Sequence, residues 1–434
     1  MGADPLEELF EAQLARAALA PVDRALAREL VYGVVRWQMT LDWLIARKTG
    51  GRAQRPVLGA LLRLGLFQMF WLERIPDHAA VNETVALARQ FGCGPQAGFV
   101  NALLRGYARQ KGATRQALRA LQDTEPALGY SHPAWLVERW GRRWGHARAR
   151  QLLQWNNTPA ETCARLNTLR ADASQLLAQW RNEGVDYDFG RWDWLPENLV
   201  FALKAHPPLA GLPSFQRGWF YVQDPSTLLA PLMLAPQPGE AVLDFCAAPG
   251  GKTTFIAQQM RDQGHVLAHD TSPARLKMLQ DNCARLGVDC VELAERLDRP
   301  APGSQCSLFD RALVDVPCSN TGVMRRRVDL RWRLRPQAIA RLRATQGALL
   351  AQAAQWVRSG GVLVYSTCSL EPEENRQVVD EFLAGHSGWQ LEGERELLPF
   401  VEGVDGAYVA RLRLGGSPSP HRASPSPPSG ERAG

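Results

Sequence analysis

The chain has 434 residues, of which 45% are hydrophobic and 22% are charged, and its formal net charge is +6. This composition is typical of a globular protein, and the length predicts two or three domains. The apolar stretch "LLRLGLFQMFWLERI" is interrupted by Arg63 and Glu73, which excludes a membrane-spanning helix there. The acidic start "MGADPLEELF" lacks the pattern of a secretion signal. We therefore expect a cytoplasmic protein, whose positive charge permits a polyanionic partner.

Residues 1–150 are predicted to form an all-helical domain. Apolar residues recur at a spacing of three and four in "DRALARELVYGVVRWQMTLDWLIAR" and "PVLGALLRLGLFQMFWLERI", and neither stretch contains an internal proline. In the next segment Pro76 and Asp77 form a helix-start signal and Gly92 a stop signal. The segment "FVNALLRGYARQ" continues the same helical pattern.

Residues 151–222 are predicted to form a small α+β subdomain. The segment "ETCARLNTLRADASQLLAQWRNEGVDYDFG" has the pattern of a strand, a loop, a helix and a second strand. The segment "GWFYVQDPS" predicts one more short strand.

Residues 223–415 are predicted to form an α/β domain of the Rossmann-like type. Short apolar runs rich in β-branched residues alternate with helical stretches, which favours a parallel sheet covered by helices on both faces. The predicted strands lie in "EAVLDFCAAPGG", "GHVLAHD", "FDRALVDVPCS", "GGVLVYSTCS" and "AYVARLRL". Residues 416–434 are rich in proline, serine and glycine, and we predict a disordered tail.

The segment "VLDFCAAPGGKTTFIAQQM" predicts a strand, a glycine turn and a helix, an arrangement that presents a helix N-terminus to a ligand. Gly250 and Gly251 would allow close approach, and Asp270 at the end of the next predicted strand would accept from ribose hydroxyls. This spacing indicates an adenosine-containing cofactor, and the missing GxGxxG pattern counts against NAD. The plainer alternative is a turn that only closes a βα unit. Lys252 is unfavourable at a helix start, which indicates an anionic neighbour, although a lysine there could also extend to solvent.

Eight cysteines are scattered along the chain with no CxxC pair, which disfavours a zinc site and a disulfide framework. Cys318 in "DVPCSNTG" and Cys368 in "YSTCS" both follow predicted strands. Because the carboxyl ends of parallel strands meet at one edge of a sheet, these thiols, Asp315 and the glycine turn should converge there. Either cysteine alone would more often be a packing residue.

Two thiols beside a carboxylate suit the methylation of cytosine at carbon 5. A thiolate that adds to carbon 6 makes carbon 5 nucleophilic, a carboxyl group supports the ring nitrogen, and a second ionisable group assists release. Spacing alone does not decide which cysteine attacks. By analogy with DNA cytosine methyltransferases, which use the thiol of a Pro-Cys pair, the attacking thiol would be Cys318.

The motifs "CAAPGGKTT", "DVPCSNTG" and "YSTCS" with "PEEN" resemble, in order and spacing, those of the Sun-type RNA 5-methylcytosine methyltransferase family, which uses S-adenosylmethionine. The segments "RLNTLR", "VQDPS" and "DGAYVARL" match weaker motifs. The helical region resembles a NusB-like RNA-binding domain through "DRALARELVYGVVRW", "IPDHAAVNETVALAR" and "FVNALLR". The resemblance covers all of the chain except the tail.

This resemblance implies Cys368 as the nucleophile, Cys318 as the residue that assists product release, and Asp315 as a contact of both cytosine and cofactor. It implies a set of residues that bind S-adenosyl-L-methionine: Cys246, Ala247, Ala248, Pro249, Gly250, Gly251, Lys252, Asp270, Arg275 and Asp315. The implied substrate is a cytosine of 16S ribosomal RNA. We accordingly expect small-subunit ribosomal RNA as the partner, no DNA, no membrane, and a monomer.

The chain departs from the family pattern in "VDCVELAERLDRP", the stretch that corresponds to the end of the family's third strand. The usual Gly-Asp pair is absent, ungapped counting places Arg296 at the acidic position, and Glu295 is the nearest substitute for an adenine contact. "DVP" replaces the commoner "DAP".

The run "MRRRVDLRWRLRP" places six arginines and Trp332 after Cys318, which suits phosphate contacts and base stacking. A solvated charged helix is the alternative.

Three other functions are alternatives for this sequence. The same chemistry on tRNA or another RNA would use the same motifs. A non-catalytic RNA-binding or antitermination factor with a vestigial methyltransferase fold is disfavoured because both cysteines, Asp315 and Lys252 are present. A dinucleotide-dependent oxidoreductase is disfavoured by the missing GxGxxG pattern.

Overall fold

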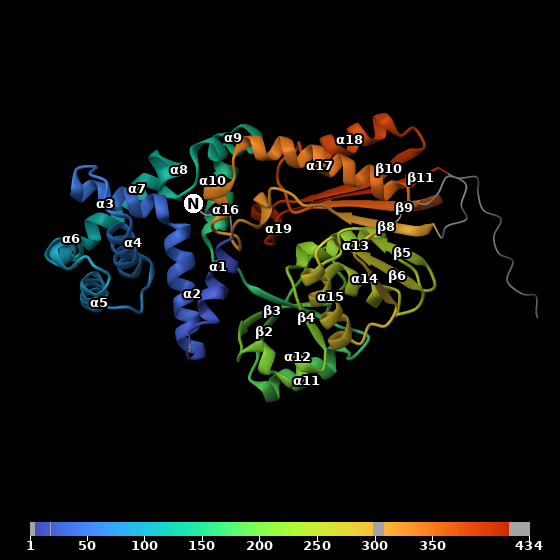
Figure 1. Cartoon of the computed structure of the whole chain (residues 1–434), viewed down its shortest axis with the longest axis horizontal. Helices are drawn as coiled ribbons and strands as arrows, with labels where there is room; N and C mark the ends of the chain where they lie inside the picture. Colours follow the sequence, from blue (N-terminus) through green and yellow to red (C-terminus); the bar gives the residue numbers. More distant parts are fainter. Residues whose placement is uncertain (1–4, 18, 298–307, 416–434) are drawn as a thin grey trace, which may run out of the picture.

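The structure is a computed structural model that describes residues 5–17, 19–297 and 308–415. A helical region stands at one end of a large sheet domain, and a smaller sheet subdomain lies below them (Figure 1). The tail predicted for residues 416–434 lies outside the described residues. Within the described part, no helix is long and apolar enough to cross a membrane.

The N-terminal region is entirely helical, as predicted. Its helices are α1 (Leu6–Leu14), α2 (Pro21–Arg36), α3 (Gln38–Thr49), α4 (Pro56–Trp71), α5 (Asp77–Gln90), η1 (Gly94–Gln96), α6 (Ala97–Arg109), α7 (Lys111–Thr124), α8 (Pro126–Gly129), α9 (Ala134–Trp144) and α10 (His146–Asn157). Pro76 caps α5 and Gly92 adopts a positive φ just after it, so both signals in the sequence are confirmed. The fully buried Leu62 and Leu66 of α4 lie in the core of this region.

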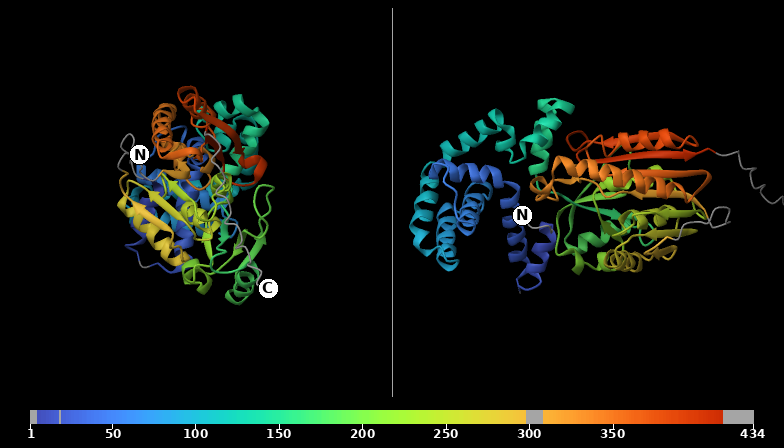
Figure 2. Two further views of the ribbon diagram at one scale, coloured as in Figure 1. Left: turned by 90° about the vertical axis from the view of Figure 1, so that its right-hand side faces the viewer. Right: turned by 45° about the horizontal axis from the view of Figure 1, so that its top comes forward.

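Helices α9 and α10 pack on the sheet domain. Trp140 of α9 and Leu152 of α10 share an apolar core with Met324 and Leu370, which follow the two site cysteines in the chain. Arg139 of α9 forms ion pairs with Glu371 and Glu373. Helix α9 therefore holds the "EPEEN" segment in place. In the turned view on the right of Figure 2, the helical region again stands at one end of the sheet domain.

The small subdomain contains a four-stranded antiparallel sheet in the order β2-β3-β1-β4. Its elements are β1 (Thr162–Leu166), α11 (Ala173–Glu183), β2 (Asp186–Phe189), β3 (Val200–Ala205), η2 (Leu209–Gly211), α12 (Pro213–Gln216) and β4 (Phe220–Val222). Strands β1, β2 and β4 and helix α11 confirm the sequence pattern, whereas β3 was not predicted. Four consecutive buried residues begin β3, so it lacks the alternation that marks a half-buried strand.

The large domain is built on a seven-stranded sheet in the order β10-β11-β9-β8-β5-β6-β7. The strands are β5 (Ala241–Asp244), β6 (His265–His269), β7 (Val291–Ala294), β8 (Phe309–Asp315), β9 (Val357–Thr367), β10 (Trp389–Leu397) and β11 (Ala407–Leu414). Its helices are η3 (Pro225–Leu228), α13 (Leu229–Leu234), α14 (Gly251–Gln259), α15 (Pro273–Leu286), η4 (Thr321–Val323), α16 (Leu330–Arg333), α17 (Pro336–Ala354), α18 (Arg376–Gly385) and α19 (Pro399–Glu402).

Strands β5 to β9 pair in parallel, with α17 and α18 on one face and α13, α14 and α15 on the other (Figure 1), which confirms the Rossmann-like α/β prediction. The expectation of a purely parallel sheet is wrong at one edge. Strand β11 pairs antiparallel with β9, and β10, which was not predicted, pairs antiparallel with β11. The largely polar, partly exposed sequence of β10 is that of an edge strand, and it lacks the apolar run that marks a central one.

A buried arginine joins the helical region to the sheet domain. Arg331 is fully buried and donates to the Asn157 side chain at 2.8 Å and to the backbone oxygens of Asn156, Ser131 and Arg36 at 3.0, 3.2 and 3.2 Å. Burial lowers the pKa of its guanidinium, which forms no ion pair among the described residues. Arg331 therefore satisfies several carbonyl groups at once.

We predict that Arg331→Met destabilises the protein, because those carbonyl groups lose their donor in a buried place. The expected loss is on the order of 3 kcal/mol, measured by urea and thermal unfolding. The control is Arg343→Met, which removes an exposed pair with Glu381 and should cost at most about 1 kcal/mol. Equal effects of the two variants would contradict this role of Arg331.

Candidate active site

The glycine turn joins β5 to α14 and is shaped by two glycines. Gly250 has a φ of 103°, a conformation that favours glycine, and a Cβ there would lie 2.8 Å from Leu279 Cγ. A Cβ on Gly251 would lie 3.1 Å from Tyr221 Cε1. The glycines therefore permit the close approach of α15 and β4 to the turn, which places β4 beside the site.

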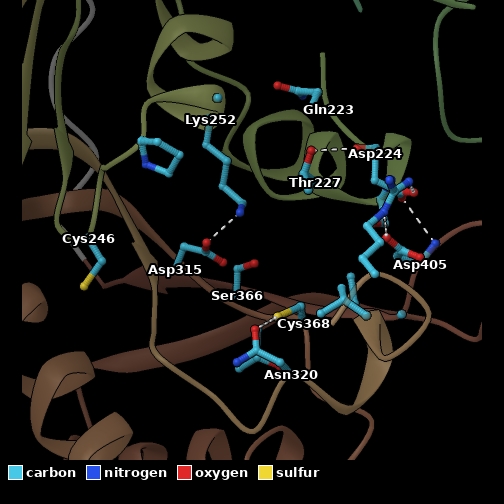
Figure 3. Close-up of a pocket in the computed structure, with 18 of the residues that line it drawn as sticks. Gln223, Asp224, Thr227, Cys246, Lys252, Asp315, Asn320, Ser366, Cys368 and Asp405 are labelled. Carbon is cyan, nitrogen blue, oxygen red and sulfur yellow. Dashed lines mark hydrogen bonds and ion pairs between the residues drawn. The ribbon is translucent and has the colours of Figure 1, made fainter. Parts of the chain in front are cut away.

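A cavity of about 410 Å³ opens at the carboxyl ends of β5, β8 and β9 (Figure 3). The residues of the sequence-predicted site that line it are Cys246, Ala247, Ala248, Pro249, Gly251, Lys252, Asp315 and Cys368. The predicted residues Gly250, Asp270, Arg275 and Cys318 are not among the residues that line it. The expected convergence of the turn, Asp315 and both thiols at one edge of the sheet is confirmed, with Cys368 in the cavity lining and Cys318 in contact with it.

Asp270 and Arg275 brace the turn from behind. The Asp270 carboxylate is nearly buried and accepts from the backbone N–H groups of Ala248 at 3.2 Å and Ser272 at 3.1 Å. Arg275 lies 3.4 Å from this carboxylate and also donates to the carbonyl oxygen of Ala248. Glu295 and Arg296 are exposed just after β7, outside the cavity lining. Roles for these residues toward a cofactor stay predictions.

Lys252 has the anionic neighbour that its place at a helix start indicated. Its Nζ donates to an Asp315 carboxylate oxygen at 2.5 Å. Burial opposes the charge of this ammonium, but the Asp315 carboxylate outweighs burial and raises the pKa of Lys252, with a smaller contribution from Cys368. Asp244 instead accepts from the Thr253 hydroxyl at 2.7 Å, and burial raises its pKa to about 7.

The two thiols lie side by side. Their Sγ atoms are 3.3 Å apart, and the Cys368 thiol donates to Asn320 Oδ1 at 3.0 Å. Asn320, at a φ of 58°, donates from Nδ2 to the carbonyl oxygen of Cys318 at 2.7 Å. One asparagine therefore contacts both cysteines, a role that the sequence analysis missed.

The environments of the two thiols differ. Cys368 is half-buried and lines the cavity, whereas Cys318 is 8% exposed and lies behind it. The hydrogen bond with Cys368 and burial raise the pKa of Cys318 well above its ordinary value. Cys163 and Cys246 also line the cavity, and burial raises the pKa of each to about 12. Among the cysteines that line the cavity, Cys368 is the one with a thiol neighbour, and its sulfur is directed at Asn320.

The opposite wall of the cavity carries a charge cluster that the sequence analysis did not find. Arg326 Nη2 lies 2.8 Å from Asp224 and its Nε lies 2.5 Å from Asp405, while the buried Arg325 contacts the same two carboxylates. Burial raises the pKa of Asp405 to about 6, whereas in Asp224 the arginines outweigh burial and lower its pKa. The weak motifs "VQDPS" and "DGAYVARL" contain these aspartates and were the only signal of the cluster.

The arginine run is divided between internal and external roles. The expectation of RNA contact is wrong for Arg325 and Arg331, which are 5% and 0% exposed and are engaged by other parts of the chain. Trp332 donates to the carbonyl oxygen of Val35 in α2 at 2.7 Å. Arg327 is exposed and lines the mouth of the cavity. Compensation of buried carbonyls and carboxylates explains much of this basic run.

Three family models match the chain. They are "16S rRNA methyltransferase RsmB/F" over residues 231–413, "NusB family" over residues 3–109, and "Methyltr_RsmF/B-like, ferredoxin-like domain" over residues 132–203. Together they match most of the helical region, most of the small subdomain and the large domain from residue 231 onward.

Similar proteins span almost the whole chain. The "Probable ribosomal RNA small subunit methyltransferase B" of Synechocystis sp. is 39% identical over 425 residues, covering 92% of this chain and 93% of that protein. The protein of the same name in Bacillus subtilis is 34% identical, covering 92% of each. A crystal structure of a methyltransferase homolog protein from Pyrococcus horikoshii is 30% identical, with a TM-score of 0.58, covering 66% of this chain and 97% of that one. The residues of the matched motifs form the cavity described above. Because relatives with 34–39% identity span 92% of the chain, the chain belongs to the 16S rRNA methyltransferase RsmB/F family.

Proposed function

We propose that this protein transfers a methyl group from S-adenosylmethionine to carbon 5 of a cytosine in 16S ribosomal RNA, through a covalent bond between Cys368 and the base. The observation that carries the proposal is the pair of thiols 3.3 Å apart, with the Lys252–Asp315 ion pair beside Cys368 in one cavity. Family membership supports the reaction class, and the names of the relatives support the RNA.

The residues of the cavity fit S-adenosylmethionine. A volume of about 410 Å³ is in the range of small-molecule sites. Gln223 lines the cavity, and its Nε2 is buried with no hydrogen-bond partner, so a donor is available for an anionic group. We assign the backbone of residues 246–252 and Gln223 to binding this molecule, with Asp270 and Arg275 supporting the turn. When bound, it supplies an electrophilic methyl group.

Cys368 is the residue that attacks the base. Its thiolate forms a bond from Sγ to carbon 6 of cytosine, and the ring double bond moves so that carbon 5 becomes nucleophilic. The Lys252 ammonium lines the same cavity, so its positive charge acts on the attacking thiolate. Asp315 faces the same space, and a proton passed from the Lys252 ammonium through the Asp315 carboxylate to the ring nitrogen offsets the electron density that builds up there as the thiolate adds. The ring nitrogen returns this proton when the thiolate is eliminated.

Cys318 assists the release of the product. After carbon 5 has been methylated, its proton leaves to water, the Sγ–carbon 6 bond breaks and the ring double bond is restored. Cys368 then carries a thiolate again. Cys318 lies within hydrogen-bond distance of this sulfur, and its raised pKa keeps its own proton available for donation to the leaving thiolate.

RNA reaches the cavity past Arg327. This guanidinium is exposed at the cavity mouth and forms no ion pair with a carboxylate among the described residues, so it can contact a phosphate beside the target base. The NusB match of the helical region supports a second RNA-binding surface on the same molecule.

We predict that Cys368→Ala forms no covalent adduct and loses at least about 10³-fold in methylation rate. Cys318→Ala should instead accumulate a protein–RNA complex that survives denaturing electrophoresis, because release is slowed. Cys163→Ala, a cavity cysteine outside the mechanism, serves as the control and should turn over normally. The reverse pattern, with an adduct only in Cys368→Ala, would make Cys318 the nucleophile.

We predict that Arg327→Ala weakens RNA binding and lowers the slope of log K against log salt by about 1, as expected for one lost phosphate contact. Fluorescence anisotropy with a ribosomal RNA fragment at several salt concentrations measures this slope. Arg142→Ala, an exposed arginine on α9, is the matched control. An equal slope for both variants and the unmodified protein would show that Arg327 makes no phosphate contact.

We predict that deletion of the gene removes the methyl group from a cytosine of 16S ribosomal RNA, and that the unmodified gene restores it while a Cys368→Ala gene does not. Mass mapping of ribosomal RNA and tRNA from the same cells measures both substrates. Loss of a methyl group in tRNA alone would change the assigned substrate while leaving the chemistry in place.

A further inference from the structure

Glu374 is a fully buried carboxylate that joins the two cysteine loops. One of its oxygens accepts from the backbone N–H of Ser319 at 2.8 Å and from Gln346 Nε2 of α17 at 2.9 Å. The other accepts from the hydroxyl of Ser369 at 2.5 Å and from that of Ser319. Ser319 follows Cys318 and Ser369 follows Cys368, so this single side chain holds the residues next to both thiols.

The charge of Glu374 is not balanced by a cation. Among the described residues no lysine, arginine or histidine forms an ion pair with it, and its four donors are neutral groups. A buried charge without a counterion is costly, and a neutral amide of the same shape could occupy this space at lower cost. Packing alone therefore does not explain a carboxylate here.

The groups around Cys318 come from several elements. Cys368 and Tyr365 come from β9 and its end, Glu374 precedes α18, and Asp315 of β8 and Lys252 of α14 lie on the cavity side. Lys252 and Asp315 offset each other. Burial raises the pKa of the Tyr365 hydroxyl, which donates to the Glu374 carbonyl oxygen at 2.5 Å, so the phenol is neutral.

The charge of the groups that surround Cys318 is therefore negative overall. It comes from Glu374 and, when ionised, from Cys368. Both charges oppose ionisation of Cys318 and are among the causes that raise its pKa, after the hydrogen bond with Cys368 and burial.

We propose that Glu374 is the positioning residue that fixes the two thiols at their separation and places a buried carboxylate next to the Cys318 loop, which disfavours attack by Cys318 and leaves Cys368 as the nucleophile. The roles of the two thiols rest on the proposed function, whereas the effect of Glu374 on Cys318 does not. A protonated Cys318 donates to the Cys368 sulfur and cannot compete with it for the base.

The test measures the alkylation of Cys318 by iodoacetamide in the full-length Cys368→Ala protein, where the space beside Cys318 is open. Peptide mass spectrometry gives the rate at each pH, without RNA or cofactor. Adding Glu374→Gln removes the charge and keeps the shape, so Cys318 should react at least about tenfold faster at pH 8, with its midpoint shifted down by about one unit. Glu374→Asp retains the charge and should keep the rate slow.

Glu373→Gln is the matched control, because this neighbouring carboxylate pairs with Arg139 and contacts neither cysteine loop. Ser319→Ala in the Cys368→Ala background keeps the Glu374 carboxylate but removes one of its hydrogen-bond donors. The negative charge is then less compensated, so Cys318 should react more slowly. This variant provides a second test if Glu374→Gln does not fold. An unchanged rate in a folded Glu374→Gln protein, or a faster rate in Ser319→Ala, would overturn the proposal. An RNA adduct of Cys368→Ala would overturn the nucleophile assignment and would leave this alkylation result intact.

Discussion

The site depends on the register of two neighbouring parallel strands. Asp315 at the end of β8 is opposite Ser366 in β9, and the backbone continues the pairing beyond the sheet, since Val316 N–H donates to Ser366 O and Gly322 N–H donates to Cys368 O, both at 3.0 Å. The loops that carry Cys318 and Cys368 therefore leave the sheet side by side. A shift of one residue in this register would turn alternate side chains to the other face and separate the carboxylate from the thiols.

Buried charge is handled in two ways in this molecule. Around the cavity each buried charge has a counterion: Lys252 forms an ion pair with Asp315, and two arginines form ion pairs with Asp224 and Asp405. At Arg331 and Glu374 it is not balanced, and neutral groups of the backbone and side chains surround a single ion. Each of these two ions bridges segments that are distant in sequence, which local backbone geometry could not bring together.

The sequence was sufficient for local features and insufficient for contacts between distant segments. Helical periodicity, the glycine turn and the two strand-end cysteines depend on neighbouring residues, and all of them were predicted. Arg325 pairs with Asp224 across 101 residues of sequence, and no periodic pattern connects the two. The arginine run was interpreted as a surface for RNA because composition does not show burial. Strands β3, β7 and β10 were missed. Strand β3 begins with four consecutive buried residues, β7 has only four residues, and β10 is largely polar.

Helix α9 supports the segment that follows Cys368, although α9 lies far before the large domain in the sequence. Trp140 donates to Glu371 across 231 residues of sequence, and the neighbouring Arg143 contacts the Leu370 carbonyl oxygen, so the segment after Cys368 is supported by residues from well before the large domain. A recombination event that exchanged the large domain alone would leave this support behind.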